Sequence, residues 1–532
     1  MRTPWTACIL LCSCCVFSSV VGKDDALESE EMWRFTADGN IMATAALDRL
    51  HVYFGTFSES AIEPESSVYC IDQTRGEKVW SHRLPDWMQA APVVTETRLY
   101  IGCNDTKLYC LNKFTGSELW HFDTAGKIDS TPCVSVQGHV YFGSRDGFLY
   151  ALNADGNLRW SEFLSGPVAS SPIFDEFAGR LYVADMANTI HAFDLDGERL
   201  WSYKPRLANI DGLRLRIFSS PALDNEQFLY VGSGDNHIYA INKETGTLFW
   251  RIDAGSIVDA SPVISLDDFL YVANRQGVLF KVLIEPFAEE RIVWQSESVG
   301  QVFYGSPSID AQQNIYLCGA PRLESPEETP KTQLSYIDHE TGEILWSTLL
   351  DGYTDATPVV DAEGNVYVGT ASNELYKIRG AGHVLADTPW PTFHGTPSGH
   401  GRYEQTFSRW LEDFGIPVEF ANLERDSDKD GFVDFEEFVQ GTIPSSNLSV
   451  PDRSPRIVEA EDVSLKIVYE LQKALRAKVV VEESSDLLGW APFLLTPNDS
   501  QYEDAESFFR VSTTVPQAAN GRQRWYRVRW LR

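Results

Sequence analysis

The stretch from residue 426 to residue 437 has the donor spacing of a calcium site. Asp426, Asp428 and Asp430 place carboxylates at alternate positions, and the glycine after them allows a sharp bend. Calcium takes about six to eight oxygen ligands at roughly 2.3 to 2.6 Å. A backbone carbonyl, a carboxylate acting directly or through water, and a bidentate glutamate would complete the set. The pattern therefore predicts bound Ca²⁺, with the ligands Asp426, Asp428, Asp430, Phe432, Asp434 and Glu437.

This loop matches the calcium loop of an EF-hand at its diagnostic positions. The alternative is an acidic surface turn, but carboxylates this close repel one another unless a cation joins them. Pro417 limits any entering helix, and the chain shows no second loop of this kind. A single site favours a structural calcium clip over a switch. The segment 406–445 resembles the single calcium loops of dockerin-like and thrombospondin-type segments in secreted bacterial proteins.

A second set of side chains recurs three positions before a proline, or before Ala45 in the first copy. If the copies form a ring, these side chains should point near one mouth of its central channel. Their carboxylates, rings and amide suit a cation, a sugar or a peptide end. They are spread round the ring, however, so a solvated funnel rim is the favoured interpretation and a binding site is the alternative. The set consists of Met42, Gln89, Asp129, Ala169, Phe218, Asp259, Tyr304 and Asp355.

Cysteine and histidine indicate little chemistry. Cys70 and Cys110 occupy a place that alanine fills in other copies, which predicts small buried side chains. Cys103 and Cys110 should lie on neighbouring strands, so their pairing as a disulfide stays open. The histidines show no metal-binding spacing and no Ser, His and Asp set emerges, so we predict no catalytic residue.

The elements that position these residues are repeats. One short aromatic phrase recurs about every 41 to 51 positions, and each copy ends in an apolar run closed by tryptophan. This period with alternating strands is typical of β-propeller blades, because one four-stranded sheet cannot bury both of its faces alone. We predict an all-β fold with an eight-bladed β-propeller of four-stranded blades. The tyrosines that mark the copies are Tyr53, Tyr100, Tyr141, Tyr182, Tyr230, Tyr271, Tyr316 and Tyr367.

The two ends of the array predict how the ring closes. Trp33 lies in an apparent outer strand with no blade of its own, while the last unit, 357–378, lacks a clear outer strand. We predict that the N-terminal strand completes the C-terminal blade, which also removes exposed sheet edges. A free N-terminal strand beside a seven-bladed or open ring is the alternative.

Composition and the N-terminus predict export. The 532 residues carry a net charge of −32, so we expect no nucleic-acid partner, because such binding needs clustered basic charge. Residues 1–22 combine Arg2 with an apolar run and small residues before a cut, as in a signal peptide. Lipoprotein processing at Cys14 is the alternative. No later stretch is apolar enough to span a membrane. The expected location is periplasmic, cell-surface or extracellular.

The expected domains are the signal peptide at 1–22, the propeller at 23–382, a linker at 383–405, the EF-hand-like segment at 406–445 and a small β-module at 446–532. Alternating stretches such as 463–471 and 478–483 predict strands in the last of these. The module is similar to C-terminal modules of large secreted bacterial proteins.

The propeller resembles the pyrroloquinoline quinone repeat family over residues 33–382. Ser170–Pro172 with Leu181–Ala184 carries the likeness, as does Ile238–Asn242 with Trp250, and 390–395 looks like a segment that often flanks such arrays. The family includes quinone-dependent dehydrogenases and non-catalytic propellers. Those enzymes often carry adjacent cysteines beside the quinone, and the one adjacent pair here, Cys14 and Cys15, lies in the signal. We therefore expect a non-catalytic scaffold that binds protein or polysaccharide at its rim, with no pyrroloquinoline quinone. The alternative is a quinone-dependent alcohol or sugar dehydrogenase.

Overall fold

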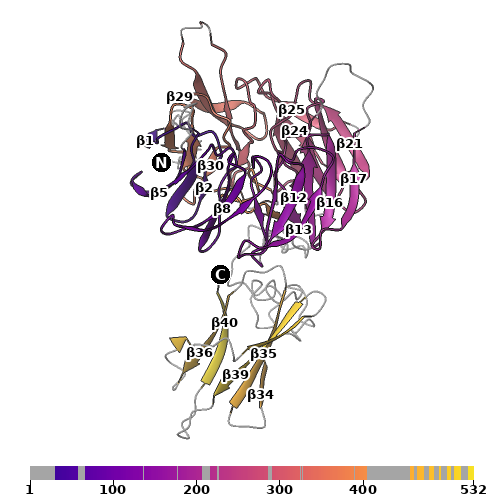
Figure 1. Ribbon diagram of the computed structural model, residues 1–532. Coiled ribbons are helices and arrows are strands. Elements are labelled where there is room, and N and C mark those ends of the chain that lie inside the picture. Colours follow the sequence, from indigo (N-terminus) through magenta and orange to yellow (C-terminus); the bar gives the residue numbers. More distant parts are fainter. Residues whose placement is uncertain are drawn as a thin grey trace, which may run out of the picture.

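In the computed structural model the repeats fold as antiparallel four-stranded sheets arranged as the blades of a ring (Figure 1). The blades are numbered 1 to 8 along the chain. The structure describes residues 30–57, 66–135, 137–175, 178–205, 216–224, 227–284, 290–323, 325, 328–386, 388 and 390–403, together with the backbone of seven later strands. The described residues contain no helix, and accordingly none that could cross a membrane. The predicted eight-bladed, all-β propeller is confirmed.

Blades 1 to 4 follow the chain from the innermost strand outward. Their strands are β2 (Ala46–Leu47), β3 (His51–Gly55), β4 (Ser66–Asp72) and β5 (Lys78–Leu84); β6 (Val93–Val94), β7 (Arg98–Gly102), β8 (Lys107–Asn112) and β9 (Glu118–Asp123); β10 (Cys133–Val134), β11 (Val140–Gly143), β12 (Phe148–Leu152) and β13 (Leu158–Phe163); β14 (Ile173–Asp175), β15 (Arg180–Asp185), β16 (Thr189–Asp194) and β17 (Arg199–Tyr203).

Blades 5 to 8 repeat this order, except that blade 8 takes its outer strand from the N-terminus. Their strands are β18 (Ala222–Leu223), β19 (Phe228–Gly232), β20 (His237–Asn242) and β21 (Leu248–Asp253); β22 (Val263–Ile264), β23 (Phe269–Ala273), β24 (Leu279–Leu283) and β25 (Ile292–Gln295); β26 (Ser308–Ile309), β27 (Ile315–Gly319), β28 (Lys331–Ile337) and β29 (Ile344–Asp351); β30 (Val359–Val360), β31 (Val366–Gly369), β32 (Glu374–Ile378) and β1 (Glu31–Thr36).

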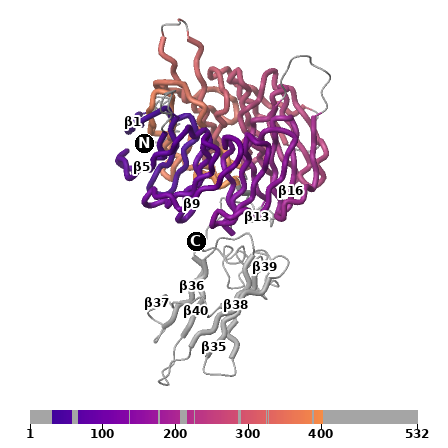
Figure 2. Tube along the Cα trace, viewed as in Figure 1, coloured from indigo at the N-terminus to yellow at the C-terminus, as the bar shows by residue number. Residues whose placement is uncertain are grey.

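The pairing of β1 with β32 closes the ring. Phe35 lies opposite Leu375 and Thr36 lies opposite Glu374 in an antiparallel ladder. Figure 2 shows this indigo strand beside the orange end of the propeller. The predicted closure by the N-terminal strand is therefore confirmed.

In six of the eight blades a tryptophan of the outer strand donates a hydrogen bond to the next blade. The indole N–H of Trp201 donates to the carbonyl of Lys243 at 3.0 Å, and its ring lies against Gly246 in the same turn. That glycine has a φ of +69°, a conformation that glycine adopts at little cost, and the absence of a Cβ makes room for the ring. The same donation joins Trp33 to Gln73, Trp80 to Lys113, Trp120 to Ala154, Trp160 to Leu195 and Trp294 to His339.

The third strands bury small side chains beneath these tryptophans. Cys70 lies opposite Trp80 and Cys110 opposite Trp120, just as Ala151 lies opposite Trp160. Both cysteines are buried, as predicted from the alanines of other copies. Cys103 and Cys110 are free thiols.

Residues 390–403, expected as a linker, run beneath the channel and pair with the ends of the inner strands. Ile264 and Ile309 donate their backbone N–H groups to Trp390 and Pro391 of this segment, both at 2.8 to 2.9 Å. The remaining pairs reach blades 1 to 4 in turn: Leu47 to Pro397, Val94 to Ser398, Val134 to His400 and Phe174 to Gly401. The segment ends as β33 (Arg402–Tyr403), a fifth strand parallel to β14. It closes one end of the channel.

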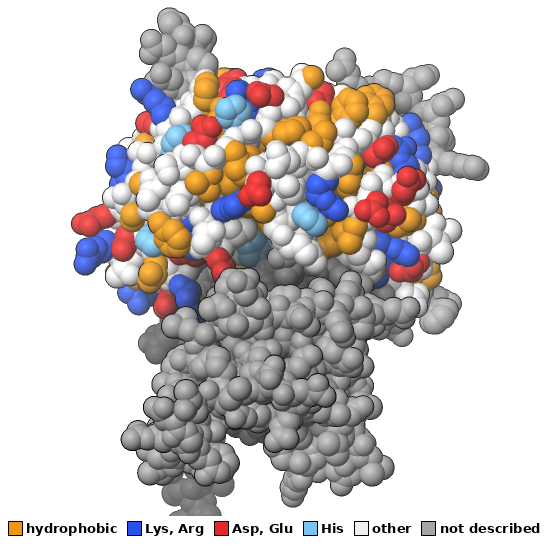
Figure 3. Space-filling view, turned by 60° about the horizontal axis from the view of Figure 1, so that its bottom comes forward, with side chains coloured by type: hydrophobic (Ala, Val, Ile, Leu, Met, Phe, Trp, Pro, Cys, Tyr) orange, Lys and Arg blue, Asp and Glu red, His pale blue; other side chains and the backbone are white. Residues whose placement is uncertain are grey.

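The outer strands expose single apolar side chains. Val79, Leu119 and Leu345 each precede the tryptophan of their strand and are about half exposed. They belong to different blades, and Figure 3 shows apolar side chains in a diagonal run across the visible face, with charged side chains of both signs on either side of it. Scattered apolar residues of this kind are normal on soluble surfaces.

After residue 403 the structure describes only the backbone of β34 (Arg456–Glu459), β35 (Ser464–Gln472), β36 (Lys478–Ser484), β37 (Ala491–Pro492), β38 (Ser500–Asp504), β39 (Phe508–Pro516) and β40 (Trp525–Leu531). They form the sheets β34-β35-β39-β38 and β37-β36-β40. The signal peptide and the calcium loop at 426–437 lie outside the described residues and stay predictions.

Candidate functional site

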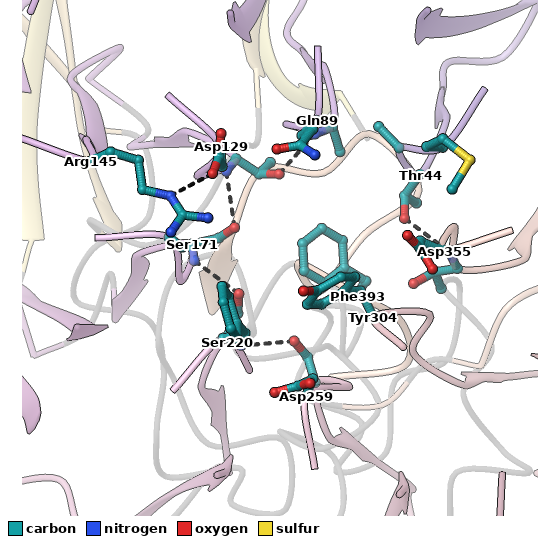
Figure 4. Close-up of a pocket in the computed structure, with 18 residues that line it drawn as sticks. Thr44, Gln89, Asp129, Arg145, Ser171, Ser220, Asp259, Tyr304, Asp355 and Phe393 are labelled. Carbon is teal, nitrogen blue, oxygen red and sulfur yellow. Dashed lines mark hydrogen bonds and ion pairs between the residues drawn. The ribbon is translucent and has the colours of Figure 1, made fainter. Parts of the chain in front are cut away.

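The residues that precede the inner strands meet at the open mouth of the channel. All eight of them line one cavity of about 190 Å³, which we call the axial cup (Figure 4). The predicted gathering at one mouth is thus confirmed. The expected solvated rim holds only in part, because Asp259 is just 5% exposed.

Backbone hydrogen bonds explain why equivalent side chains converge. In blade 3 the N–H of Arg145, on the turn between the second and third strands, donates to the carbonyl of Lys127, two residues before Asp129. The same bond recurs in most blades, so each turn residue is held beside the rim residue of its own blade. The equivalent donors and acceptors are Phe57 to Asn40, Asn104 to Trp87, Met186 to Pro167, Gly234 to Arg216, Arg275 to Ile257 and Ala371 to Tyr353.

A ring of hydroxyl groups forms the wall of the axial cup. In seven of the eight blades the residue before the proline that leads into the inner strand donates its N–H to a Ser or Thr hydroxyl of the next blade, at 2.9 to 3.0 Å. The chain of bonds runs from Ala91 to Thr131, Ser171, Ser220, Ser261, Ser306, Thr357 and Thr44. It is interrupted only between blades 1 and 2, because Ala91 has no hydroxyl. These bonds hold seven of the eight inner-strand junctions at a fixed spacing.

Two of the three rim carboxylates are paired with arginine. Arg145 Nε lies 2.5 Å from Asp129, and Arg275 contacts Asp259 in the same way in blade 6. Burial raises the pKa of Asp259, and Arg275 opposes that rise. Each pair joins the rim residue and the turn residue of one blade.

Asp355 in blade 8 is the exception. Its turn partner is Ala371, which has no charge to offer. The Asp355 Oδ1 atom is buried and has no hydrogen-bond partner among the described residues. Burial raises the pKa of the Asp355 carboxyl to about 6, and the positive charge of Arg275 opposes the rise. The axial cup therefore holds one carboxylate without a counter-ion.

Aromatic rings form the floor and part of the wall. Phe393, from the segment that closes the channel, lines the bottom of the axial cup, and Tyr304 lies near Asp355 in the view of Figure 4. Phe218 and Tyr304 meet edge to face with their ring centroids 5.4 Å apart. Arg216 lies over Phe218 at 4.8 Å. The positive charges thus lie on the side of blades 3 to 6.

The residues of the axial cup do not fit a quinone cofactor with its calcium ion. None of the five described cysteines lines the cup; all are buried elsewhere. Within the described ranges, no three His, Cys, Asp or Glu side chains are grouped to hold a metal ion. Arginines already occupy two of the three aspartates. The arrangement is suited to binding a small polar group.

Spacing alone identified the rim but missed Arg145, Arg275 and Phe393. The arginines come from a different turn of each repeat, and their place is visible only when the repeats are aligned on that turn. Both lie two residues after the small residue that ends the second strand, Gly143 or Ala273, and Ala371 follows Gly369 in the same way. Phe393 is delivered by a segment outside the repeats, so no periodicity signals it.

Comparison with known proteins identifies the repeats. A family model described as outer membrane protein assembly factor BamB matches residues 18–128 and 104–320, more than half of the chain. The chain belongs to this family. This agrees with the expected membership of the pyrroloquinoline quinone-type repeat proteins. A member from Yersinia pestis, outer membrane protein assembly factor BamB, is 23% identical over 322 residues, covering 56% of this chain and 74% of the relative.

Solved structures show the fold alone. The structure of BamB from Moraxella catarrhalis has a TM-score of 0.53 at 15% identity and covers 67% of this chain and 99% of the other. A europium-containing methanol dehydrogenase has the same TM-score at 12% identity, covering 66% of this chain and 93% of the other. Because a dehydrogenase and an assembly factor are equally similar, the fold does not decide the activity.

Proposed function

We propose that this protein is an exported, non-catalytic propeller scaffold that binds a protein partner on the face where the axial cup opens. The observation that carries the proposal is the composition of the cup: a carboxylate without a counter-ion, aromatic rings and hydroxyls, without a metal-binding group among the described residues. The family supports it, because its members are named as assembly factors of outer membrane proteins.

Site-specific photo-crosslinking tests the proposed face. A benzoylphenylalanine at Tyr353, which is exposed just before the inner strand of blade 8, should give a discrete protein adduct in the native envelope. The matched control is Phe114, an exposed aromatic residue on a turn between a third and an outer strand, at the opposite face. Equal adducts from both positions, or none from Tyr353, would contradict protein binding at the cup face. A polysaccharide partner would instead give adducts that glycosidases remove.

The quinone-dependent oxidoreductase remains the competing function. Purified protein mixed with pyrroloquinoline quinone and calcium should show no cofactor-dependent change in absorbance and no dye reduction with alcohols or sugars. Tight quinone binding with turnover would contradict the scaffold proposal and show that the protein is an oxidoreductase.

The calcium loop adds a structural role to the proposal. Asp426, Asp428, Asp430, Phe432, Asp434 and Glu437 would hold one Ca²⁺ as a clip between the propeller and the C-terminal β-module. Calorimetry of calcium binding should give heat with the natural protein and none with an Asp426→Ala, Glu437→Ala double variant. Identical heats would remove the assignment.

Export rests on the N-terminal segment 1–22 and on relatives named for the outer membrane. A periplasmic location fits both, and a cell-surface or extracellular location fits the signal alone. Fractionation of the native cell distinguishes them, and recovery of the full-length chain in the cytoplasm would contradict export.

A further inference from the structure

The axial cup has two unlike halves. Blades 3 to 6 contribute the two ion pairs, and Arg216 lies beside them over Phe218. Blades 7, 8, 1 and 2 contribute Tyr304, Asp355, Met42 with Thr44, and Gln89, with no cation among these lining residues. The second half therefore carries one carboxylate, that of Asp355, with no cationic side chain in the same half to pair with it.

The position of Ala371 explains why this half has no such cation. In blades 3 and 6 the equivalent turn residue is an arginine that neutralises the rim aspartate of its own blade. In blade 8 the backbone hydrogen bond is the same, but the side chain ends at Cβ. No arginine of its own blade therefore neutralises Asp355, and a cation from outside the chain can pair with its carboxylate in the cup.

We propose that the axial cup binds a protonated primary amine, with its ammonium against Asp355 and its methylene groups against Tyr304 and Phe393. The proposal deepens the proposed function, on which it rests: the amine is a lysine side chain of the protein partner. The net charge of −32 also favours a basic partner, which would carry such lysine residues.

Size and donor geometry select this ligand class. A cavity of about 190 Å³ is smaller than the roughly 300 to 1,000 Å³ typical of drug-sized ligands, but it admits an alkylammonium chain. Asp355 is the one rim carboxylate that pairs with no arginine, and the compact charge of an ammonium group needs less room beside it than a planar guanidinium group. Nearby aromatic rings attract organic cations. A metal ion would need several grouped oxygen ligands, which the described residues do not supply.

The experiment is a binding titration of the full chain with three probes: N-acetyl-lysine methylamide, its Nε-acetylated form, and n-butylamine. The lysine derivative should bind, and the acetylated form, which has lost its charge, should not. Butylamine tests whether a free amine rather than a lysine residue is the ligand. A site that takes butylamine but rejects the lysine derivative would overturn the lysine assignment.

Two variants locate the site. Asp355→Asn removes the carboxylate charge, and Ala371→Arg supplies the internal partner that blades 3 and 6 already have. Each should weaken binding of the lysine derivative by at least about tenfold. The matched controls are Asp123→Asn and Leu119→Arg, which make the same charge changes at exposed positions of an outer strand and should leave binding unchanged. Binding by Ala371→Arg equal to that of the natural protein would overturn the proposal.

The same variant separates this proposal from the proposed function. If the Tyr353 crosslink to a protein persists undiminished in Ala371→Arg, the partner does not use an amine in the cup, and the scaffold function stands alone. If the amine binds as described but no protein adduct forms, the amine site is supported and the proposed protein partner is contradicted.

Discussion

The ionised form of Asp355 destabilises the folded protein, because its carboxyl is largely buried. Its pKa of about 6 means that the folded protein binds this proton more tightly than the unfolded chain, where the usual pKa is about 3.9. Stability therefore falls as pH rises from about 4 to about 6. The charge of Arg275 opposes the rise of the Asp355 pKa, and the Asp355 carboxylate in turn helps to raise the pKa of Tyr304. A destabilising carboxylate in a cavity is typical of a binding site.

Asp355→Asn should consequently stabilise the protein at neutral pH. The variant lacks the cost of ionising a buried carboxyl, so its free energy of unfolding at pH 7.5 should exceed that of the natural protein by up to about 3 kcal/mol. Near pH 4, where Asp355 is protonated when folded, the difference should vanish. Denaturant unfolding at both pH values measures this. An equal effect at both values would show that charge is not the cause.

For the rim residues, the sequence predicted where the side chains lie better than it predicted which of their charges are paired. The spacing before the inner-strand prolines located every rim residue, because a repeat carries equivalent positions to equivalent places. It did not show that Asp129 and Asp259 are neutralised while Asp355 is not, because their partners lie on another turn. The calcium ligands Asp426 to Glu437 remain a prediction.

Among the elements, the turn that packs against the tryptophan of the preceding blade needs glycine for two reasons: its positive φ and its lack of a Cβ. Gly156 has a φ of +82°, and a Cβ there would lie 2.6 Å from the Trp120 ring. Gly255 also has a positive φ, +70°, but a Cβ there would meet nothing within 4 Å. The two glycines therefore separate backbone strain from the tryptophan contact.

Gly255→Ala should cost roughly 1 kcal/mol through backbone conformation alone. Gly156→Ala should cost roughly 2 kcal/mol more, because Trp120 must also move. Thermal unfolding of both variants measures the difference. Equal losses would show that the tryptophan contact does not hold the blades together.

The gap in the hydroxyl ring at Ala91 predicts a substitution that raises stability. Ala91→Ser supplies an acceptor for the N–H of Thr44 and should stabilise the propeller by about 1 kcal/mol. Ser171→Ala leaves the buried N–H of Thr131 without its acceptor and should destabilise by about 2 kcal/mol. Chemical denaturation compares them. A loss of stability in both variants would mean that the junction between blades 1 and 2 is closed by packing rather than by hydrogen bonding.

The blades themselves were predictable because each satisfies local rules: alternating strands, a glycine turn and a closing tryptophan. The segment 390–403 was not, since it has no regular strand period and its backbone is satisfied by the ends of strands from six different blades. Only the closed ring brings those ends together.

For the whole molecule, we expect the pairing of β1 with β32, which closes the ring, to make unfolding more cooperative. Without it, blade 8 would lose its outer strand, and the turn at Gln73 to Gly76 would lose Trp33. A chain starting after Ala37 should unfold at a lower temperature and over a broader range than one starting at Glu30. Calorimetry of the two chains measures this, and superimposable transitions would contradict the closure.

Hydrogen exchange of the protein alone and with its crosslink-identified partner tests the central claim most directly. Binding at the axial cup predicts slower exchange in the cup-side turns 104–106, 144–147, 274–277 and 370–373, and unchanged exchange in the turns of the opposite face, such as 112–116 and 242–246. Protection confined to that opposite face, or to the outer strands, would contradict the account.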